Sequence, residues 1–303
     1  METTHFSIAA VERDTGLSKD VLRMWERRYG FPEPSRDANG ERAYPGAQVE
    51  RLRLIKRLID QGHRPGKLIA SADDELAALA PRRPASRLPE DNPAPADLDE
   101  LLLLIKQHDA AGFQQAMQQR LARQGMQRFV QDTIAPLTRL VGEAWVAGNI
   151  EVFEEHLFTE LTKRLLRQAI STLPGGQRTP RVLLTSVPDE PHVIGLLMAE
   201  ALFALEGAEC IPLGTQMPLL EIARAASAHH ADIVALSFSG AFPQRQIPAL
   251  LQQLRMVLPA TVSLWVGGSG VVRLPKMEGV QLLASLDEAI AAITRWRAEQ
   301  AGI

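Results

Sequence analysis

The sequence predicts a multidomain protein with a small helical head, an all-helical middle part and a final α/β part built on a parallel sheet. Apolar residues recur at helical spacing through most of the first 173 residues, and a proline-rich stretch interrupts this pattern after residue 78. From residue 178 onward, short apolar runs alternate with helical segments, which is typical of a parallel sheet covered by helices. A length of 303 residues is enough for about two or three domains.

The composition indicates a globular protein of a reducing compartment. Hydrophobic residues make up 46% of the chain and charged residues 23%, so a core can form without disulfides. The single cysteine, Cys210, lies in an apolar run, which favours a buried small residue over a nucleophile. The N-terminus lacks the apolar segment of a secretory signal, and no apolar run approaches the ~20 residues of a membrane helix. We therefore expect a cytoplasmic protein without a membrane partner.

Charge is unevenly distributed along the chain. The net charge is −3, yet residues 18–67 contain twelve Lys or Arg against seven Asp or Glu. A basic head on a mildly acidic body indicates a polyanionic partner for the head only.

The head has the pattern of a helix-turn-helix. Residues 6–13 predict a short helix capped by Ser7, Gly16 provides a turn, and Ser18 caps a second helix over residues 19–28. The second helix places three basic residues along one face, at i, i+4 and i+8: Lys19, Arg23 and Arg27.

A predicted hairpin follows this motif. Asn39-Gly40 lies between two short extended segments, which is a hairpin signal. Such a hairpin beside a helix-turn-helix forms a wing that can grip phosphates through Arg36, Arg42 and Tyr44. A third helix is predicted over residues 47–60, and a short one begins near Pro65.

Residues 6–75 resemble the winged helix-turn-helix of MerR-type transcription regulators. The matching residues are Ile8-Ala9-Ala10-Val11, Gly16-Leu17-Ser18, Leu22-Arg23-Met24-Trp25-Glu26, Arg36 and Asn39-Gly40 with Arg42-Ala43-Tyr44. The resemblance implies that the head binds double-stranded operator DNA. The residues that it assigns to this contact are Ser18, Lys19 and Arg23 in the recognition helix, and Arg36, Arg42 and Tyr44 on the DNA backbone.

The chain departs from many MerR-type proteins just after the head. Those proteins dimerise through a long coiled-coil helix, whereas five prolines between residues 79 and 96 exclude a continuous helix here. We expect a tethered head over residues 1–78, a linker over 79–96, and oligomerisation through another part of the chain.

Residues 97–176 predict a four-helix bundle. The candidate helices span residues 97–108, 110–124, 126–148 and 152–173, and Pro136 is expected to kink or divide the third. Trp145 closes the third helix, while Glu155 and His156 begin the fourth, so an aromatic ring, a carboxylate and an imidazole could meet at one end of the bundle. The alternative is a core Trp and a solvated surface His.

Residues 177–303 predict an α/β domain of flavodoxin-like size. Strands are expected near residues 181–187, 209–213, 232–237, 262–266 and 280–284, and helices near 193–206, 218–229, 244–258 and 286–300. The carboxyl-end loops would carry small and hydroxyl residues at 214–215, 237–240 and 267–270, which leave room for a long polar group. A G-x-G-x-x-G motif after the first strand is absent, which counts against NAD.

The first of these loops carries the residues best suited to bind a metal. His192 offers an imidazole, a good ligand for a transition metal, and Glu190 two residues earlier can hold the other ring N–H. Gly195, three residues later, lets a large planar group approach the backbone. A lone His in such a loop could instead be a solvated or capping residue.

Residues 97–303 resemble the cobalamin-binding module, in which a helical cap precedes a flavodoxin-like domain. The signature is an acidic residue, His and Gly, then a serine loop, then Gly-Gly: here Glu190, His192 and Gly195, then Ser237, then Gly267-Gly268. The resemblance implies that His192 binds cobalt from below, where it replaces the nucleotide base. The displaced tail would enter a slot lined by the serine and glycine loops. The family often has Asp at position 190, and Asp189 is adjacent, so which carboxylate holds the imidazole stays open.

The whole chain resembles the CarH/LitR family of light-sensing repressors. That resemblance implies adenosylcobalamin, or another cobalamin, and a homo-oligomer, either dimer or tetramer, without enzymatic activity. Trp145, Glu155 and His156 would cover the upper face of cobalt, and His156 is a candidate upper ligand after photolysis. Some relatives have a His where this chain has Val146, which could alter the photochemical step. Two alternatives remain: a sensor that holds haem or no cofactor, and a corrinoid methyl-transfer module.

Overall fold

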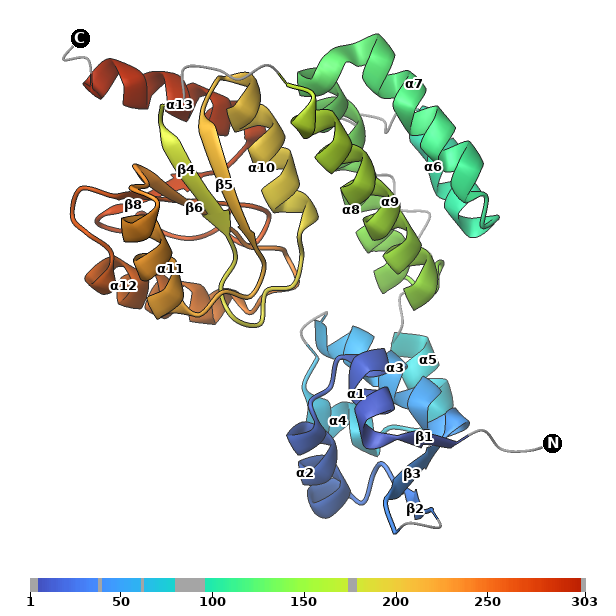
Figure 1. Ribbon diagram of the computed structural model, residues 1–303. Helices are drawn as coiled ribbons and strands as arrows, with labels where there is room; N and C mark the ends of the chain where they lie inside the picture. The colour runs from blue at the N-terminus through green and yellow to red at the C-terminus, as the bar shows by residue number, and fades with distance from the viewer. Residues whose placement is uncertain (1–4, 38–39, 61–62, 80–95, 174–178, 301–303) are drawn as a thin grey trace. The chain divides into compact units, whose positions relative to one another are not determined.

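The computed structural model describes residues 5–37, 40–60, 63–79, 96–173 and 179–300 (Figure 1). Asn39 of the predicted hairpin and residues 80–95 of the predicted linker lie outside these ranges. The chain divides into two compact units, which are described separately below. The first comprises Met1–Asp91 with Ala144–Asn149, and the second comprises Asn92–Glu143 with Ile150–Ile303.

The head is a helix-turn-helix with a small antiparallel sheet. Its elements are β1 (His5–Ser7), α1 (Ile8–Thr15), α2 (Lys19–Tyr29), β2 (Ser35–Arg36), β3 (Arg42–Pro45), α3 (Gly46–Asp60), α4 (Pro65–Ala70) and α5 (Asp73–Leu79). The predicted caps are confirmed: the Ser7 side chain accepts a hydrogen bond from the Ala10 amide, and Ser18 accepts one from the Val21 amide. The sheet order is β1-β3-β2, and neither β1 nor α5 was predicted.

Tyr44 corrects one expectation about DNA contact. Its ring is 0% exposed and packs in the core of the head with Leu22, Trp25 and Leu52. Position 44 therefore points inward from β3, and the structure does not support a contact between Tyr44 and DNA. Burial raises the pKa of the Tyr44 hydroxyl, and this hydroxyl has no hydrogen-bond partner among the described residues.

The second part of the chain begins with helical segments. They are α6 (Ala96–Lys106), α7 (Ala110–Arg128), a π-helical turn (Phe129–Ile134), α8 (Ala135–Val146) and α9 (Val152–Ser171). The predicted third helix is divided, as Pro136 suggested, and the predicted interruption at residue 125 is confirmed, since Gly125 has a φ of 74° that is not helical. A hydrogen bond of 2.9 Å from the Thr133 hydroxyl to Gln124 spans both irregularities.

The α/β part contains a five-stranded parallel sheet. Its strands are β4 (Arg181–Thr185), β5 (Glu209–Gly214), β6 (Ile233–Ser237), β7 (Ser263–Gly267) and β8 (Val280–Leu283), in the order β5-β4-β6-β7-β8. This is the flavodoxin-like order, which reverses direction between β4 and β6. In open α/β sheets, ligands bind outside the carboxyl ends of the strands at that point of reversal. The loops that follow β4 and β6 are therefore the first place to look for a site.

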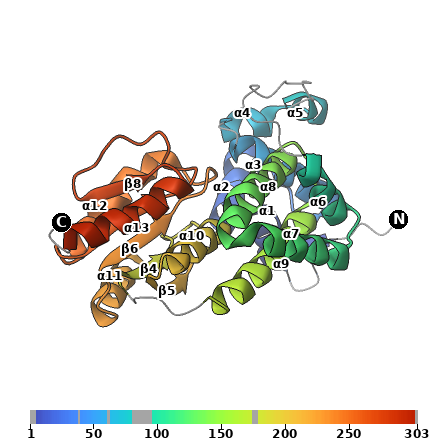
Figure 2. The same cartoon turned by 90° about the horizontal axis from the view of Figure 1, so that it is seen from above.

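Helices cover both faces of this sheet (Figures 1 and 2). The covering helices are α10 (Ile194–Leu205), α11 (Leu219–Ala228), α12 (Ile247–Val257) and α13 (Leu286–Gln300), and a short 3₁₀ turn (Gln244–Gln246) precedes α12. Successive residues of β4 serve opposite faces: Val182 and Leu184 pack with α10 and α13, and Leu183 packs with α11 and α12. Apolar residues on both faces explain the continuous apolar runs of the sequence.

Helix α9 packs against α10, and an ion pair with a buried carboxylate links them. Arg167 on α9 lies 3.3 Å from the carboxylate of Glu200 on α10, which is 8% exposed at the side chain. Burial raises the pKa of Glu200, although the charge of Arg167 opposes this. Helices α9 and α10 begin at the same end of the unit (Figure 1). Among the described helices, none has the length and apolar character needed to cross a membrane.

Replacing Tyr44 tests its buried role. Tyr44→Phe removes only a hydroxyl that lacks a partner, so we expect the free energy of unfolding to stay constant or to rise by up to ~1 kcal/mol. Tyr44→Ala leaves a cavity and should lower it by ~3–5 kcal/mol. Urea unfolding of the full chain measures both changes. Weaker DNA binding by a stable Tyr44→Phe variant would contradict the buried placement.

Candidate functional site

A buried carboxylate lies in the loop between β4 and α10. Glu190 is 1% exposed, and its Oε1 lies 2.6 Å from Nδ1 of His192. His192 keeps 53% of its side chain exposed, so the imidazole stands at the surface with a carboxylate behind it. Asp189 is exposed, with a φ of 66°. The structure thus favours Glu190 over Asp189 as the carboxylate that holds the ring.

Glu190 is itself held by the loop that follows β6. The Ser239 amide donates to Glu190 Oε2 at 2.7 Å, and the Ser239 hydroxyl donates to the same oxygen at 3.0 Å. Burial by itself raises the pKa of Glu190, but hydrogen bonds from His192 and Ser239 outweigh it, so the pKa lies below its usual value. An ionised Glu190 favours the His192 tautomer with the proton on Nδ1, in which Nε2 carries the lone pair that a metal would bind.

Two glycines allow the loops around His192 to approach closely. A Cβ at Gly195 would lie 2.5 Å from the Ser237 hydroxyl, so the first turn of α10 meets the end of β6. A Cβ at Gly268 would lie 2.3 Å from the Phe238 carbonyl, and the φ of Gly268 is +97°. At Gly267 the nearest atom would be 3.6 Å away, which is an ordinary contact. Glycine is therefore required sterically at Gly268, where a Cβ would meet backbone. The requirement is weaker at Gly195, where a Cβ would meet a hydroxyl that can rotate, and none is evident at Gly267.

The donor set suits one kind of metal group. Within the described ranges, no three His, Cys, Asp or Glu side chains are grouped so that they could hold a metal ion. A single imidazole backed by a carboxylate instead suits a metal that arrives with its other ligands in place, as in a corrinoid or a haem. The residues around His192 thus fit such a group.

A second carboxylate–imidazole pair lies at the start of α9. His156 Nδ1 is 2.9 Å from Glu155 Oε2, and the Thr159 hydroxyl donates to the other oxygen of Glu155 at 2.8 Å. The side chain of His156 is 72% exposed. The structure therefore brings Glu155 and His156 together as a pair. Trp145 lies in the last turn of α8 and belongs to the first unit, so its approach to a ligand stays a prediction.

Ser239 is a functional candidate that the sequence analysis missed. The pattern Ser237-Phe238-Ser239 offers two hydroxyls on one loop, and no local signal tells which of them reaches Glu190. Their contacts differ because the chain turns at the end of β6: Ser237 faces Gly195, whereas Ser239 binds the carboxylate.

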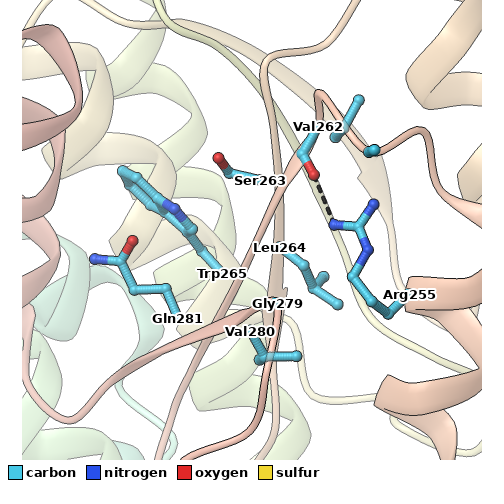
Figure 3. A pocket seen from close by; sticks show the side chains of 9 residues that line it. Arg255, Val262, Ser263, Leu264, Trp265, Gly279, Val280 and Gln281 are labelled. Atoms are coloured by element: carbon cyan, nitrogen blue, oxygen red, sulfur yellow. Dashed lines mark hydrogen bonds between the residues drawn. The ribbon is translucent and has the colours of Figure 1, made fainter. Parts of the chain in front are cut away.

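Two other features have structural explanations and do not belong to the candidate site. An open hollow lies where β7 and β8 begin, at the edge of the sheet opposite His192 (Figure 3). The guanidinium of Arg255 lines this hollow and donates hydrogen bonds to the carbonyls of Val262 and Leu258 at 2.7 and 3.0 Å, so it caps the end of α12.

Burial, together with the charge of Glu200, raises the pKa of Cys210 to about 12, so this thiol is not a nucleophile at neutral pH.

The second helix of the head offers exposed cations to a polyanion. Lys19 lies 3.5 Å from Glu12 and Arg23 lies 3.4 Å from Asp20, with 43% and 48% of the two basic side chains exposed. Such exposed ion pairs are weak, so phosphates can compete for both cations. Ser18 has a different role, because its hydroxyl caps the helix.

The wing is anchored to this helix. Arg42 on β3 donates to both carboxylate oxygens of Glu26 on α2, at 2.8 and 3.3 Å, and the hydrogen bond with Glu26 raises the pKa of Arg42. Arg42 therefore positions the wing, and its contact with DNA stays a prediction. Arg36 donates to the Gly40 carbonyl at 2.5 Å across the hairpin.

Comparison with known proteins gives matches both for the head and for the part of the chain that follows it. Residues 6–70 match the family model of the MerR HTH family regulatory protein, and residues 97–170 match that of the B12 binding domain. The chain is 30% identical over 257 residues to the HTH-type transcriptional repressor CarH of Myxococcus xanthus, with 84% of this chain and 85% of that protein covered. It is also 30% identical over 269 residues to the repressor CarA of the same organism, with 87% and 86% covered.

A solved structure supports the fold of the larger unit. The Methanosarcina barkeri monomethylamine corrinoid protein superposes with a TM-score of 0.54 and 16% sequence identity, and the match covers 66% of this chain and 98% of that one. At this level of identity the likeness shows the fold alone.

Two glycine substitutions test the close approach of the loops. Gly268→Ala places a Cβ against the Phe238 carbonyl at a positive φ, so it should lower the free energy of unfolding by more than ~1 kcal/mol. Gly142→Ala, on helix α8 with open space around it, should raise it by up to ~1 kcal/mol. Equal effects in urea unfolding would contradict the geometry described for Gly268.

Proposed function

The chain belongs to the MerR-type transcription regulators that carry a B12-binding domain, and on that premise we propose that it is a light-responsive repressor using adenosylcobalamin. The observation that carries the proposal is the pair of Glu190 and His192 at the point where the strand order reverses. When bound, adenosylcobalamin would supply a cobalt–carbon bond that light can break.

The residues below the ligand would bind the cofactor and orient the imidazole that holds it. His192 offers Nε2 to cobalt, and Glu190 fixes the orientation and the tautomer of the ring. Gly195 and Gly268 keep the loops close together, and the Ser237 hydroxyl is available to a polar tail. A haem could use the same imidazole, so the spectrum of the loaded protein decides between the two groups.

The residues above the ligand belong to the helical part. Arg167 binds Glu200 where α9 packs on α10. His156 lies about three turns before Arg167, and His192 lies about two turns before Glu200. Because α9 and α10 begin at the same end of the unit (Figure 1), both imidazoles lie toward that end. This supports a role for α9 as a lid whose Glu155 and His156 respond to the group above the metal, together with Trp145.

Regulation follows from a difference between the loaded and the photolysed states. We infer that the lid favours a homo-oligomer while the adenosyl group is in place, and that several heads then bind the operator together. Multivalent binding strengthens the weak affinity of a single head. Loss of the upper group removes the contacts that favour the oligomer, as any ligand-coupled equilibrium requires. The protein is therefore proposed as a regulator without catalytic activity.

A methyl-transfer module is the second candidate, because the solved structure of like fold is a corrinoid protein. The head favours regulation instead, since its exposed Lys19 and Arg23 suit DNA. Methyl transfer from loaded protein to a thiol would support the second candidate.

The central test uses purified full-length chain incubated in the dark with adenosylcobalamin. We expect the protein to leave a desalting column coloured, with a corrinoid spectrum, and to form an oligomer that dissociates under green light. His192→Ala should weaken cobalamin retention by about 10- to 100-fold and change the spectrum. His229→Ala, at the exposed C-cap of α11, is the matched control and should behave as wild type.

Three outcomes would count against this proposal. Colourless protein would exclude cobalamin, an unaltered His192→Ala spectrum would exclude that ligand, and an oligomer insensitive to light would leave a ligand sensor only. Size-exclusion profiles of Trp145→Ala in the dark separate the lid from the ligand site, since we expect this variant to bind cobalamin without forming the oligomer.

DNA binding by the head has its own test. Arg23→Ala should weaken operator affinity and reduce the slope of log affinity against log salt by about one. Arg224→Ala, on α11, removes an arginine in the same i, i+3 arrangement with an acid and serves as the control. Mobility-shift titrations at several salt concentrations measure both slopes. An Arg23→Ala curve that coincides with the control would exclude contact through this face.

A further inference from the structure

Ser186 is a fully buried residue that joins two loops at the carboxyl edge of the sheet. It is 0% exposed and follows the last residue of β4. Its hydroxyl donates to the Glu190 carbonyl at 2.5 Å and accepts from the Gln216 amide at 2.9 Å. Its own carbonyl accepts from the Met217 amide at 2.9 Å. One small side chain thus connects the loop that carries His192 to the loop that follows β5.

Both of these loops contain backbone that needs support. Asp189 has a φ of 66° and Gln216 a φ of 61°, in the left-handed region that residues other than glycine rarely adopt. Such conformations persist where the surrounding contacts hold them. The Ser186 hydroxyl binds the residue that follows Asp189 and the amide of Gln216 itself, so it supplies a contact at each turn.

Glu190 is consequently held from two directions. Ser186 binds its backbone carbonyl from the β4 and β5 side, and Ser239 binds its carboxylate from the β6 side. The position of the carboxylate sets the orientation of His192, because Oε1 contacts both the ring Nδ1 at 2.6 Å and the His192 amide at 3.1 Å. Movement of the Glu190 backbone would therefore turn the imidazole.

We propose that Ser186 is a positioning residue for His192, which couples the loop after β5 to the strength of the imidazole–metal bond through the Glu190 carbonyl. This inference rests on the proposed function, because it takes His192 as the metal ligand. It adds a residue that contacts neither the imidazole nor the space above it. Partners one residue removed from a ligand typically change metal affinity by about 10- to 100-fold when they are removed.

The neighbouring Thr185 provides a matched control. It is also 0% exposed and ends β4, and its hydroxyl donates to the Gly214 carbonyl at 3.0 Å and to the Ser186 carbonyl at 3.3 Å, not to the Ser186 side chain. Thr185 makes no described hydrogen bond with Glu190. Thr185→Val therefore removes a buried hydroxyl at the same edge of the sheet and keeps the tie between Ser186 and Glu190. A purely structural role for the region predicts equal effects of the two substitutions.

The experiment compares wild type, Ser186→Ala and Thr185→Val as full-length protein, with cob(II)alamin as the probe. A nitrogen bound to Co(II) splits the cobalt lines in the electron paramagnetic resonance spectrum, whether it comes from an imidazole or from the cofactor's own benzimidazole. Protein labelled with 15N-histidine separates the two, because 15N gives a doublet where 14N gives a triplet, and nitrogen splitting below means this doublet. We expect wild type and Thr185→Val to show nitrogen splitting in the whole bound population. Ser186→Ala should show it in a reduced fraction, with a dissociation constant raised about 10- to 100-fold.

Hydrogen exchange on the protein without cobalamin supplies a second readout. Ser186→Ala should increase exchange at the Gln216 amide and in the residues around Glu190, and Thr185→Val should leave both slow. If Ser186→Ala does not fold, Ser186→Cys replaces it. The thiol is a weaker hydrogen-bond partner of similar size, so it should give a smaller loss of ligation in the same direction.

The outcomes separate this inference from the proposed function. Absence of nitrogen splitting in wild type would overturn His192 as ligand, and with it the role of Ser186. Normal wild-type splitting with unchanged splitting and affinity in the Ser186 variants would overturn the positioning role alone. Equal losses in Ser186→Ala and Thr185→Val would likewise overturn it, since they would show general loosening of the sheet edge.

Discussion

The loops at the carboxyl ends of β4 and β6 are organised around a buried carboxylate. Glu190 is 1% exposed, and a carboxylate removed from water is stable only when hydrogen-bond donors surround it. Its donors are the ring and amide of His192 and the amide and hydroxyl of Ser239. Leaving a buried acceptor without one of its donors typically costs about 1–3 kcal/mol. The loops after β4 and β6 must therefore come together before the charge is tolerated, which makes the site a part of the fold.

The topology of the sheet makes this assembly feasible. The strand order reverses between β4 and β6, so the helices that follow these two strands lie on opposite faces and leave the loops free at the edge. Gly195 and Gly268 then permit separations that a Cβ would prevent. The loop backbones pack closely around the Glu190 carboxylate, and this packing explains why glycines stand at positions 195 and 268.

The helical part has irregularities where a sensor would need them. Gly125 and the π-helical turn (Phe129–Ile134) interrupt the path from α7 to α8, and π-helical turns are frequent at functional sites. Helix α9 is fastened to α10 by the pair of Arg167 and Glu200, whose carboxylate is buried. Movement of α9 would expose or unpair that carboxylate.

Local patterns in the sequence determined most of the architecture. The helix caps at Ser7 and Ser18 depend on residues within three positions, and the alternation of strands and helices after residue 178 depends on short periodicities, so both were predictable. The pair of Glu190 and His192 is also local, since a single residue, Pro191, lies between them. The fold of the head and the choice of His192 as the candidate ligand followed from these signals.

Tertiary structure alone decided which partners the local motifs meet. Ser239 reaches Glu190 across 49 residues, and Ser186 reaches Gln216 across 30, so no spacing rule could reveal either contact. The sequence predicted a surface position for Tyr44 on the wing, whereas the packing of α2 and α3 buries it. The physical reason is the same in each case: burial and hydrogen bonding depend on which distant segments arrive at a point, and that is a property of the folded chain.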